Sequence, residues 1–253
     1  PIHRYQGYGR FDVQLTITTN EQCKDTVVKT AEIFPKPTAK FSTSNVCQVD
    51  TAFFYDSAFV NDASLIRWEW DFADGDTSMD RNPSHNYAVA DTYAVRQIVT
   101  TNHSCKDTAF NDLVIYPMPK VDFTTNDSIQ CLVNNDFQFT NQSTIKWGTM
   151  KYRWITTSGD TLLPGDTARK SDFSKIYPDF GDFTVNLKAT SNFGCQADTT
   201  KLMQVFPDPT AKFHITDGCT GAPQKFLDLS TTQKGVVDSW RWAFGNDSSS
   251  IKQ

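Results

Sequence analysis

Apolar residues occupy every second position in several short segments of the chain. Residues 11–17 (Phe-Asp-Val-Gln-Leu-Thr-Ile) and 183–187 (Phe-Thr-Val-Asn-Leu) alternate strictly, and residues 93–95 do so over a shorter run. In residues 68–72 (Trp-Glu-Trp-Asp-Phe) the three aromatic residues share one face and the two acids point to the other. Alternation of period two predicts strands with one buried face. No stretch combines a 3.6-residue apolar period with helix caps, so we expect an all-β protein.

The same landmarks recur along the sequence at a spacing of 82 to 90 residues. A tyrosine precedes a cysteine by 18 residues three times, and a phenylalanine follows after another 18, in the sets Tyr5–Cys23–Phe41, Tyr87–Cys105–Phe123 and Tyr177–Cys195–Phe213. A Pro-x-Pro step comes before each phenylalanine, within residues 34–37, 116–119 and 206–209. The aromatic segment 68–72 recurs at residues 152–154 and 240–244. A period of this length predicts one small domain per repeat.

The Pro-x-Pro steps predict short stiff linkers, because proline fixes φ and favours extended conformations before it. They divide the chain into the C-terminal part of a domain at 1–35, complete domains at 36–117 and 118–207, and the N-terminal part of a domain at 208–253. Half a set of strands cannot close a core, so we expect the parent chain to extend in both directions. Roughly seven short strands per complete repeat predict immunoglobulin-like β-sandwiches.

One repeat resembles a known family. Residues 70–76 (Trp-Asp-Phe-Ala-Asp-Gly-Asp), 82–87 (Asn-Pro-Ser-His-Asn-Tyr) and 91–95 (Asp-Thr-Tyr-Ala-Val) are similar to the W-D-F-G-D-G, N-P-x-H-x-Y and G-x-Y-x-V hallmarks of the PKD (polycystic kidney disease) domain. The next repeat departs from the first hallmark, with Ile-Thr-Thr-Ser-Gly-Asp at 155–160, and the last has Ala-Phe-Gly-Asn-Asp at 243–247. The resemblance implies tandem PKD β-sandwiches in an extended array.

The Cys-x-Asp-Thr segments at 23–26 and 105–108, together with the Pro-x-Pro linkers, resemble PKD arrays of secreted Bacteroidota proteins. These include the very large adhesins of gliding species that the type IX secretion system exports. The resemblance implies a non-catalytic stalk or spacer segment of an extracellular cell-surface adhesin, which projects a binding tip for gliding motility or attachment. It implies as partners the neighbouring repeats, the type IX secretion machinery during export, and polysaccharide or other surface proteins. Alternatives are spacer modules of a secreted hydrolase, of chitinase or protease type, and a carbohydrate-binding module that uses Trp147 or Phe193.

Charge and hydropathy argue against two classes of partner. The net charge of the 253 residues is −5 and the sequence pI is about 5.3, which argues against nucleic-acid binding. Mean hydropathy is −0.47, and no apolar run approaches the ~20 residues of a membrane-spanning helix. The chain opens Pro-Ile-His-Arg without the apolar segment of a signal peptide, as expected for a window of a longer protein.

The sequence carries no recognisable catalytic motif. It lacks G-x-S-x-G, a P-loop and H-E-x-x-H, and its four histidines are scattered, at His3, His85, His103 and His214. His3 and His85 share one repeat position, so we expect His85 to be a structural hydrogen-bonding group beside the strand of Trp70. We therefore predict no enzyme activity, no catalytic residue and no cofactor.

Acidic residues are densest at Asp71, Asp74, Asp76 and Asp80. Carboxylates are the ligands that calcium prefers, and this makes Asp71, Asp74 and Asp76 candidate calcium ligands. The spacing is not that of an EF-hand, however, and the neighbouring repeats lose most of these acids. The alternative is a tight turn in which aspartates hydrogen-bond their own backbone.

The six cysteines fall at two repeat positions: Cys23, Cys105 and Cys195 in a turn, and Cys47, Cys131 and Cys219 between the first two strands of a repeat. Position-locked cysteines without C-x-x-C predict disulfides rather than a zinc site. In an immunoglobulin-like sandwich the two positions usually lie at opposite ends, whereas the bottom of one domain faces the top of the next. One hypothesis is therefore a bridge between repeats, Cys47–Cys195, and bridges within a repeat are an equal alternative. Bridges within a repeat, Cys47–Cys105 and Cys131–Cys195, stay open if the first strand is short or displaced.

A tripeptide of Asp, Ser or Thr, and an apolar residue or Thr recurs along the chain. It resembles the O-glycosylation signal of Bacteroidota. The candidate acceptors are Thr26, Thr51, Ser57, Thr108, Ser128, Thr161, Thr167 and Thr199. Glycans there would shield exposed strand edges.

Overall fold

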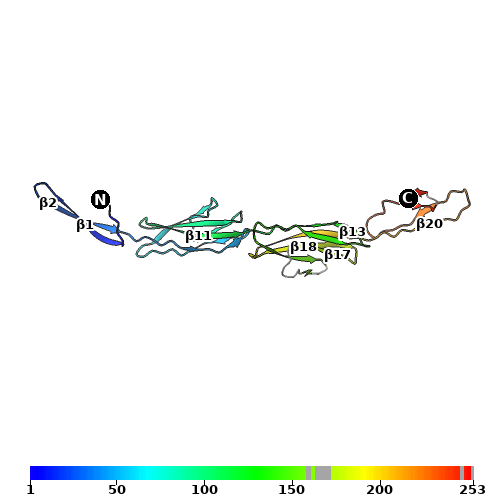
Figure 1. Cartoon of the computed structure of the whole chain (residues 1–253), viewed down its shortest axis with the longest axis horizontal. Coiled ribbons are helices and arrows are strands. Elements are labelled where there is room, and N and C mark those ends of the chain that lie inside the picture. Colours follow the sequence, from blue (N-terminus) through cyan, green and yellow to red (C-terminus); the bar gives the residue numbers. More distant parts are fainter. Residues whose placement is uncertain (158–160, 163–171, 246–247, 252–253) are drawn as a thin grey trace. The chain divides into compact units, whose positions relative to one another are not determined.

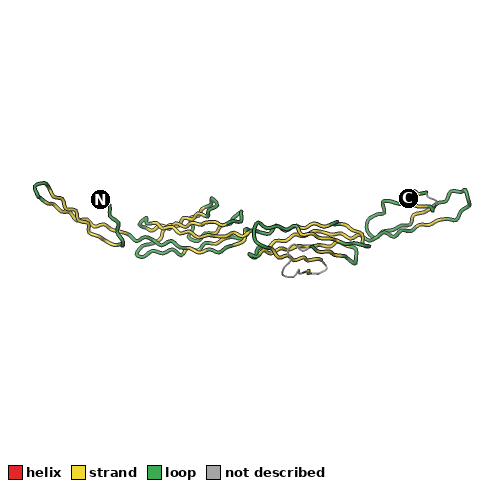
Figure 2. Tube along the Cα trace, viewed as in Figure 1, coloured by secondary structure: helices red, strands yellow, loops and turns green. Residues whose placement is uncertain are grey.

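The computed structural model describes residues 1–157, 161–162, 172–245 and 248–251. Throughout these residues the regular elements are β-strands, with no helix (Figures 1 and 2). The described part of the chain accordingly contains no helix that is long and apolar enough to cross a membrane. The chain divides into two compact units, Pro1–Met118 and Pro119–Gln253, which are described separately below.

The first unit begins with a long two-stranded hairpin. Strand β1 (Gly9–Thr18) pairs antiparallel with β2 (Lys24–Ile33) along its whole length, from Gly9 opposite Ile33 to Thr18 opposite Lys24. The alternation of residues 11–17 thus produces two distinct faces. Apolar residues of β1 lie on one face, and polar cross-strand pairs such as Thr30–Asp12 (2.7 Å) lie on the other.

A two-layer sandwich makes up the rest of the first unit. One layer is a five-stranded sheet in the order β4-β11-β10-β7-β8, whose strands are β4 (Val46–Cys47), β11 (Lys106–Tyr116), β10 (Thr92–Thr101), β7 (Leu65–Asp71) and β8 (Thr77–Ser78). The other layer consists of two short pairs, β3 (Phe41–Ser42) with β6 (Tyr55–Asp56) and β5 (Ala52–Phe53) with β9 (Ser84–His85). Both layers bury their inward-facing side chains in one shared core.

The second unit repeats this plan. Its five-stranded sheet runs β13-β19-β18-β15-β16, with β13 (Ile129–Cys131), β19 (Gln196–Phe206), β18 (Gly181–Ser191), β15 (Met150–Thr156) and β16 (Thr161–Leu162). The facing sheet runs β12-β14-β17, with β12 (Phe123–Thr125), β14 (Phe137–Asn141) and β17 (Phe173–Lys175). Beyond it lie two short pairs, β20 (Phe213–Ile215) with β21 (Phe226–Asp228) and β22 (Trp242–Ala243) with β23 (Ser249–Ser250).

Aromatic side chains fill both sandwich cores at equivalent positions. Trp70 is 2% exposed and packs edge-on against Phe41, with ring centroids 4.9 Å apart. Trp154 is 1% exposed and makes the same contact with Phe123 at 5.0 Å. The second sandwich therefore keeps the core of the first although its sequence departs from the hallmark motif. The predicted fold class, all-β with immunoglobulin-like sandwiches, is confirmed.

A short parallel strand at the edge of each five-stranded sheet was not predicted. β4 pairs parallel with the end of β11, placing Cys47 opposite Tyr116, and β13 pairs in the same way with β19, placing Cys131 opposite Phe206. The first strand of each repeat therefore starts in one sheet and ends in the other. This brings the strand cysteine to the end of the last strand of its repeat.

Candidate functional site

The cysteines differ in oxidation state. Cys47 and Cys195 are the disulfide-bonded pair, and this is the pairing predicted between consecutive repeats. The other four cysteines are free thiols, at Cys23, Cys105, Cys131 and Cys219. The alternative bridges Cys47–Cys105 and Cys131–Cys195 are wrong for this structure, because Cys105 and Cys131 are not oxidised. The first strand is displaced as that alternative required, yet it does not bring its cysteine to the turn cysteine of the same repeat.

The turn cysteines share one local geometry. In each hairpin the backbone N–H at the end of the first strand donates to the cysteine carbonyl, from Thr19 to Cys23 (2.9 Å), from Thr101 to Cys105 (2.9 Å) and from Ser191 to Cys195 (2.8 Å). The side-chain oxygen of Thr19, Thr101 or Ser191 also accepts the N–H of the cysteine. A threonine or serine four residues before the cysteine therefore fixes the turn. The three turn cysteines are structurally equivalent.

The acidic segment after β7 forms a compact turn. The Asp71 carboxylate accepts the N–H of Ala73 (3.0 Å), and the Asp74 carboxylate accepts the N–H of Asp76 (3.2 Å). Asp71 also pairs with Arg96 at 3.0 Å. Asp71 and Asp74 therefore hydrogen-bond the backbone of their own turn, as the tight-turn interpretation expects. Whether calcium binds here stays a hypothesis that a calcium titration would test.

His85 closes this turn from the facing sheet. Its Nε2 lies 2.7 Å from Asp74 Oδ2 and 3.9 Å from Asp76 Oδ2, and its ring stacks on Phe72 with centroids 4.4 Å apart. Asp74, Asp76 and His85 are near enough to one another to hold a metal ion. Burial raises the pKa of the Asp74 carboxyl, but the hydrogen bonds from His85 and the Asp76 amide and the charge of His85 outweigh it, so that this pKa is lowered. The contact of His85 with Asp74 fits the structural hydrogen-bonding role that was predicted for it.

In the core beside this turn, the polar atoms of buried side chains donate hydrogen bonds to other protein groups. The indole Nε1 of Trp70 donates to the carbonyl of Asp80 at 2.8 Å, and the hydroxyl of Tyr87 donates to the carbonyl of Phe72 at 3.1 Å. Burial is the main cause that raises the pKa of the Tyr87 phenol. Gln97 is wholly buried and donates to Asp56 at 2.8 Å. The sequence analysis did not predict this pair. Gln97 lies between Val95 and Val99 on the buried face of β10, where a polar side chain is not expected.

The two aromatic candidates for carbohydrate binding are half-buried. Trp147 lies in the loop before β15, with the ammonium of Lys146 5.0 Å from its ring centroid. Phe193 lies in the turn between β18 and β19, close to Gly148, where an added Cβ would meet its ring at 2.7 Å. The Trp147 loop therefore packs against this turn at one end of the sandwich.

The candidate glycosylation positions fall on strands and turns. Thr26, Ser57, Thr108 and Ser128 are exposed, whereas Thr51 and Thr199 are half-buried. Thr161 is in β16, and Thr167 lies outside the described residues.

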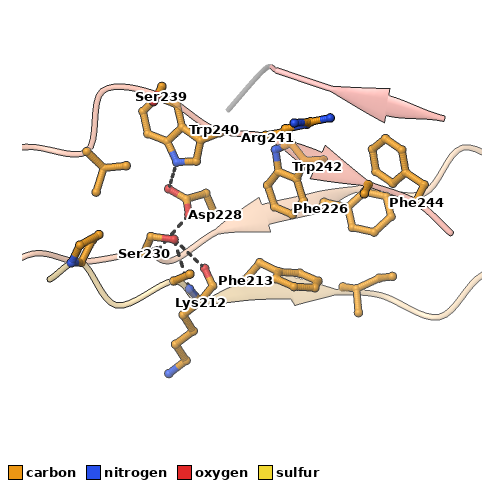
Figure 3. Close-up of a pocket in the computed structure, with 15 residues that line it drawn as sticks. Lys212, Phe213, Phe226, Asp228, Ser230, Ser239, Trp240, Arg241, Trp242 and Phe244 are labelled. Atoms are coloured by element: carbon orange, nitrogen blue, oxygen red, sulfur yellow. Dashed lines mark hydrogen bonds between the residues drawn. The ribbon is translucent and has the colours of Figure 1, made fainter. Parts of the chain in front are cut away.

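Residues 209–244 present an open aromatic face, drawn in Figure 3. Phe213, Phe226, Trp242 and Phe244, which we call the aromatic face, come from β20, β21 and the segment that contains β22. Trp242 meets Phe213 edge-on at 5.3 Å, as Trp70 meets Phe41 in the complete sandwich. Beside them Trp240 Nε1 donates to Asp228 at 2.8 Å.

Comparison with known proteins found a family model and solved structures that parts of this chain resemble. Residues 35–115 match the family model described as the PKD domain. Among solved structures, the PKD1 domain of Vibrio anguillarum Epp is similar at 24% identity and a TM-score of 0.30, covering 32% of this chain and 93% of that one. The PKD1 domain of the Vibrio cholerae metalloprotease PrtV has the same identity and TM-score, covering 32% of this chain and 96% of its own. The fibronectin(III)-like modules of Clostridium thermocellum CbhA are 11% identical with a TM-score of 0.33, covering 68% of this chain and 93% of theirs. The match to the PKD family model supports an array of PKD-like or immunoglobulin-like β-sandwiches, in which residues 35–115 are the part similar to the PKD domain.

Proposed function

We propose that this chain is a non-catalytic stalk segment of a large secreted cell-surface adhesin, and that it projects a binding tip in gliding motility or attachment. The proposal rests chiefly on the bond between Cys47 and Cys195, two cysteines that belong to consecutive repeats. A disulfide of this kind suits an extracellular protein, because such bonds persist in oxidising compartments.

The bond would change how the chain carries tension. Tension applied at the two ends enters at residue 1, reaches Cys47, crosses the sulfur–sulfur bond to Cys195 and continues to residue 253. Strands β5 to β18 lie between these two cysteines in the sequence, so they belong to a covalent loop that the tension bypasses. Most of both sandwiches is thereby protected from being pulled open. Such protection is useful in a load-bearing stalk and brings no advantage to a catalytic site.

The repeat design supports the same role. Each complete sandwich buries its own aromatic core, with Trp70 in one and Trp154 in the other. In the turn after β7, the Asp71 and Asp74 carboxylates accept backbone N–H groups. They also pair with Arg96 and His85, respectively. A module built in this way can be repeated to any length, because each copy contributes its own stability.

The size and location of the parent chain test the proposal. An antibody against residues 36–207 would be used to blot intact cells and cells treated with an external protease. We expect a very large band that the protease removes from intact cells. A band of modest size in the culture supernatant would contradict the adhesin stalk and favour the spacer of a secreted hydrolase.

A further inference from the structure

The sandwich of the first unit carries a line of aromatic side chains on an outer face. Residues 52–59 alternate between less and more exposed positions, with Ala52 and Phe54 in the core. On the outward side lie Phe53, Tyr55 and Phe59, which we call the aromatic stripe and which are 54%, 57% and 56% exposed. A strand normally turns polar side chains to solvent and apolar ones to the core. The aromatic stripe is the reverse of this pattern at three positions.

Backbone pairing holds the aromatic stripe straight. Ser42 of β3 lies opposite Tyr55, and Ser84 of β9 lies opposite Phe53. The register between the first two strands continues unbroken to Phe59. Because a strand rises about 3.3 Å per residue, the first two rings are about 7 Å apart along the strand and the whole stripe is about 20 Å long. It is therefore a line of rings with small hydroxyl side chains beside it.

The sandwich of the second unit shows which residues the fold itself requires on this face. Its strands pair in the same register, with Phe123 opposite Asn141 where Phe41 is opposite Asp56. By this register the three stripe positions are occupied there by Gln138, Thr140 and Thr144. All three residues are polar, as expected for a face in contact with water. The fold therefore does not require aromatic residues at these positions, and three of them in one line are typical of a binding surface.

We propose that the aromatic stripe binds an extended polysaccharide of the flat, β-1,4-linked kind, whose sugar rings stack on the aromatic rings. The faces of such sugars carry C–H groups, which pack favourably on the electron-rich faces of aromatic rings. Their edges carry hydroxyls, and the side chains of Ser42, Ser84 and exposed Lys40 lie beside the stripe as hydrogen-bonding partners. The stalk proposed above would thus hold a polysaccharide along its side as well as project a tip.

The size of the aromatic stripe favours a polysaccharide over a second protein. A fully buried aromatic side chain removes 150–250 Å² from water, so three half-exposed rings offer roughly 300 Å². A stable protein interface buries about 800 Å² on each partner around a contiguous apolar core. Here the serines beside the rings interrupt such a core. A narrow line of rings fits a ligand that is itself narrow and extended.

Affinity electrophoresis of the whole chain tests the binding. The protein is run in native gels that contain hydroxyethylcellulose, a soluble β-1,4-linked glucan, or glycol chitin, a soluble β-1,4-linked amino-sugar polymer, and in gels without polymer. We expect at least one of the two polymers to retard the chain. Migration that neither polymer changes would overturn the proposal.

A triple variant tests the assignment to the aromatic stripe. Phe53→Gln, Tyr55→Thr and Phe59→Thr give each position the residue that the second sandwich carries there. We expect the dissociation constant, measured from retardation against polymer concentration, to rise roughly tenfold or more. Undiminished binding by the triple variant would overturn the assignment.

The matched control is Phe110→Thr. Phe110 is 68% exposed on β11, and its position in the second unit is occupied by Thr200. We expect this variant to bind like the unmodified chain. An equal loss in Phe110→Thr and in the triple variant would mean unspecific adsorption to exposed rings and would contradict a site at the stripe.

Further variants separate binding from misfolding and from the other candidate site. Tyr55→Thr alone should weaken binding by a measurable factor, whatever the stability of the triple variant, and unchanged affinity would count against the stripe. Trp147→Ala should bind like the unmodified chain, whereas a loss there would move the site to the Trp147 loop and overturn the proposal.

Sedimentation velocity tests a second copy as the occupant. We expect the unmodified chain and the triple variant to have the same sedimentation coefficient over a range of concentrations. Association of the unmodified chain that the triple variant abolishes would assign the aromatic stripe to an interface between copies and overturn its assignment to a polysaccharide.

Discussion

Ala73 occupies a strained backbone position in the turn that follows β7. Its φ is +64°, in the left-handed region, where the hallmark motif has glycine. A left-handed conformation costs an L-residue with a Cβ roughly 1–2 kcal/mol. The two hydrogen bonds that Asp71 and Asp74 accept from the turn backbone hold Ala73 there.

Replacing Ala73 by glycine should therefore stabilise the repeat. We expect Ala73→Gly to raise its free energy of unfolding by about 1 kcal/mol, because glycine adopts positive φ without a steric penalty. Ala94→Gly is the control of opposite sign, since residue 94 is an exposed position inside β10, where glycine destabilises a strand. Urea denaturation of the two variants measures both changes, and a loss of stability in Ala73→Gly would contradict the strain.

Trp70 and Trp147 should differ sharply in their contribution to stability. Trp70 packs between Phe41 and Phe54 and donates a hydrogen bond to Asp80, so we expect Trp70→Ala to cost roughly 3–5 kcal/mol. The same change at half-buried Trp147 should lower the free energy of unfolding by no more than about 1 kcal/mol. Comparable losses at both positions, measured by thermal unfolding, would contradict the assignment of Trp70 as the centre of the core.

Strand alternation was the most informative sequence signal for whole elements. It identified the face of β7 that buries Trp70 and the apolar face of β1, because each of these two strands has one apolar side. It could not identify β4 or β13, which are two or three residues long and pair in parallel at a sheet edge. Nor could it identify the Gln97–Asp56 hydrogen bond, since a buried amide is recognised only by the partner that folding brings to it.

The turn after β7 should make its repeat sensitive to acid. The folded-state pKa of Asp74 is lowered from 3.8, so its ionised form stabilises the folded repeat above that pH. This contribution is present above the unfolded pKa and is lost as the pH falls through the lowered folded-state pKa. We expect amide hydrogen exchange in β10 to accelerate over this range and Asp74→Asn to accelerate it already at neutral pH. Asp50→Asn, at another exposed aspartate, should leave exchange in β10 unchanged, and an equal response from both variants would refute the role of Asp74.

Calcium should leave the same turn unchanged. The Asp74 carboxylate is already engaged by His85 and by the Asp76 amide, and a cation would have to displace the histidine. We therefore expect the melting temperature to stay constant during a calcium titration. A rise that Asp76→Asn abolishes would instead assign Asp74, Asp76 and His85 as a metal site.

For the chain as a whole, the sequence period and the cysteine positions predicted the Cys47–Cys195 bond without identifying it uniquely. A bridge within each repeat fitted the spacing equally well, because the path of the first strand was unknown. The displaced strand β4 places Cys47 beside the end of β11 rather than near the turn that holds Cys105. The remaining four cysteines, at Cys23, Cys105, Cys131 and Cys219, are free thiols.

Single-molecule pulling on the whole chain, held at residues 1 and 253, tests most directly whether this is a cross-linked, load-bearing stalk. With the Cys47–Cys195 bond intact, the covalent loop cannot extend, and complete unfolding should release a chain roughly 50 nm shorter than after reduction, at ~3.4 Å per residue. A Cys47→Ser, Cys195→Ser variant should show the longer extension under both conditions. Equal extensions of the oxidised and reduced wild-type chain would mean that the bond does not bridge the repeats and would contradict the stalk proposed here.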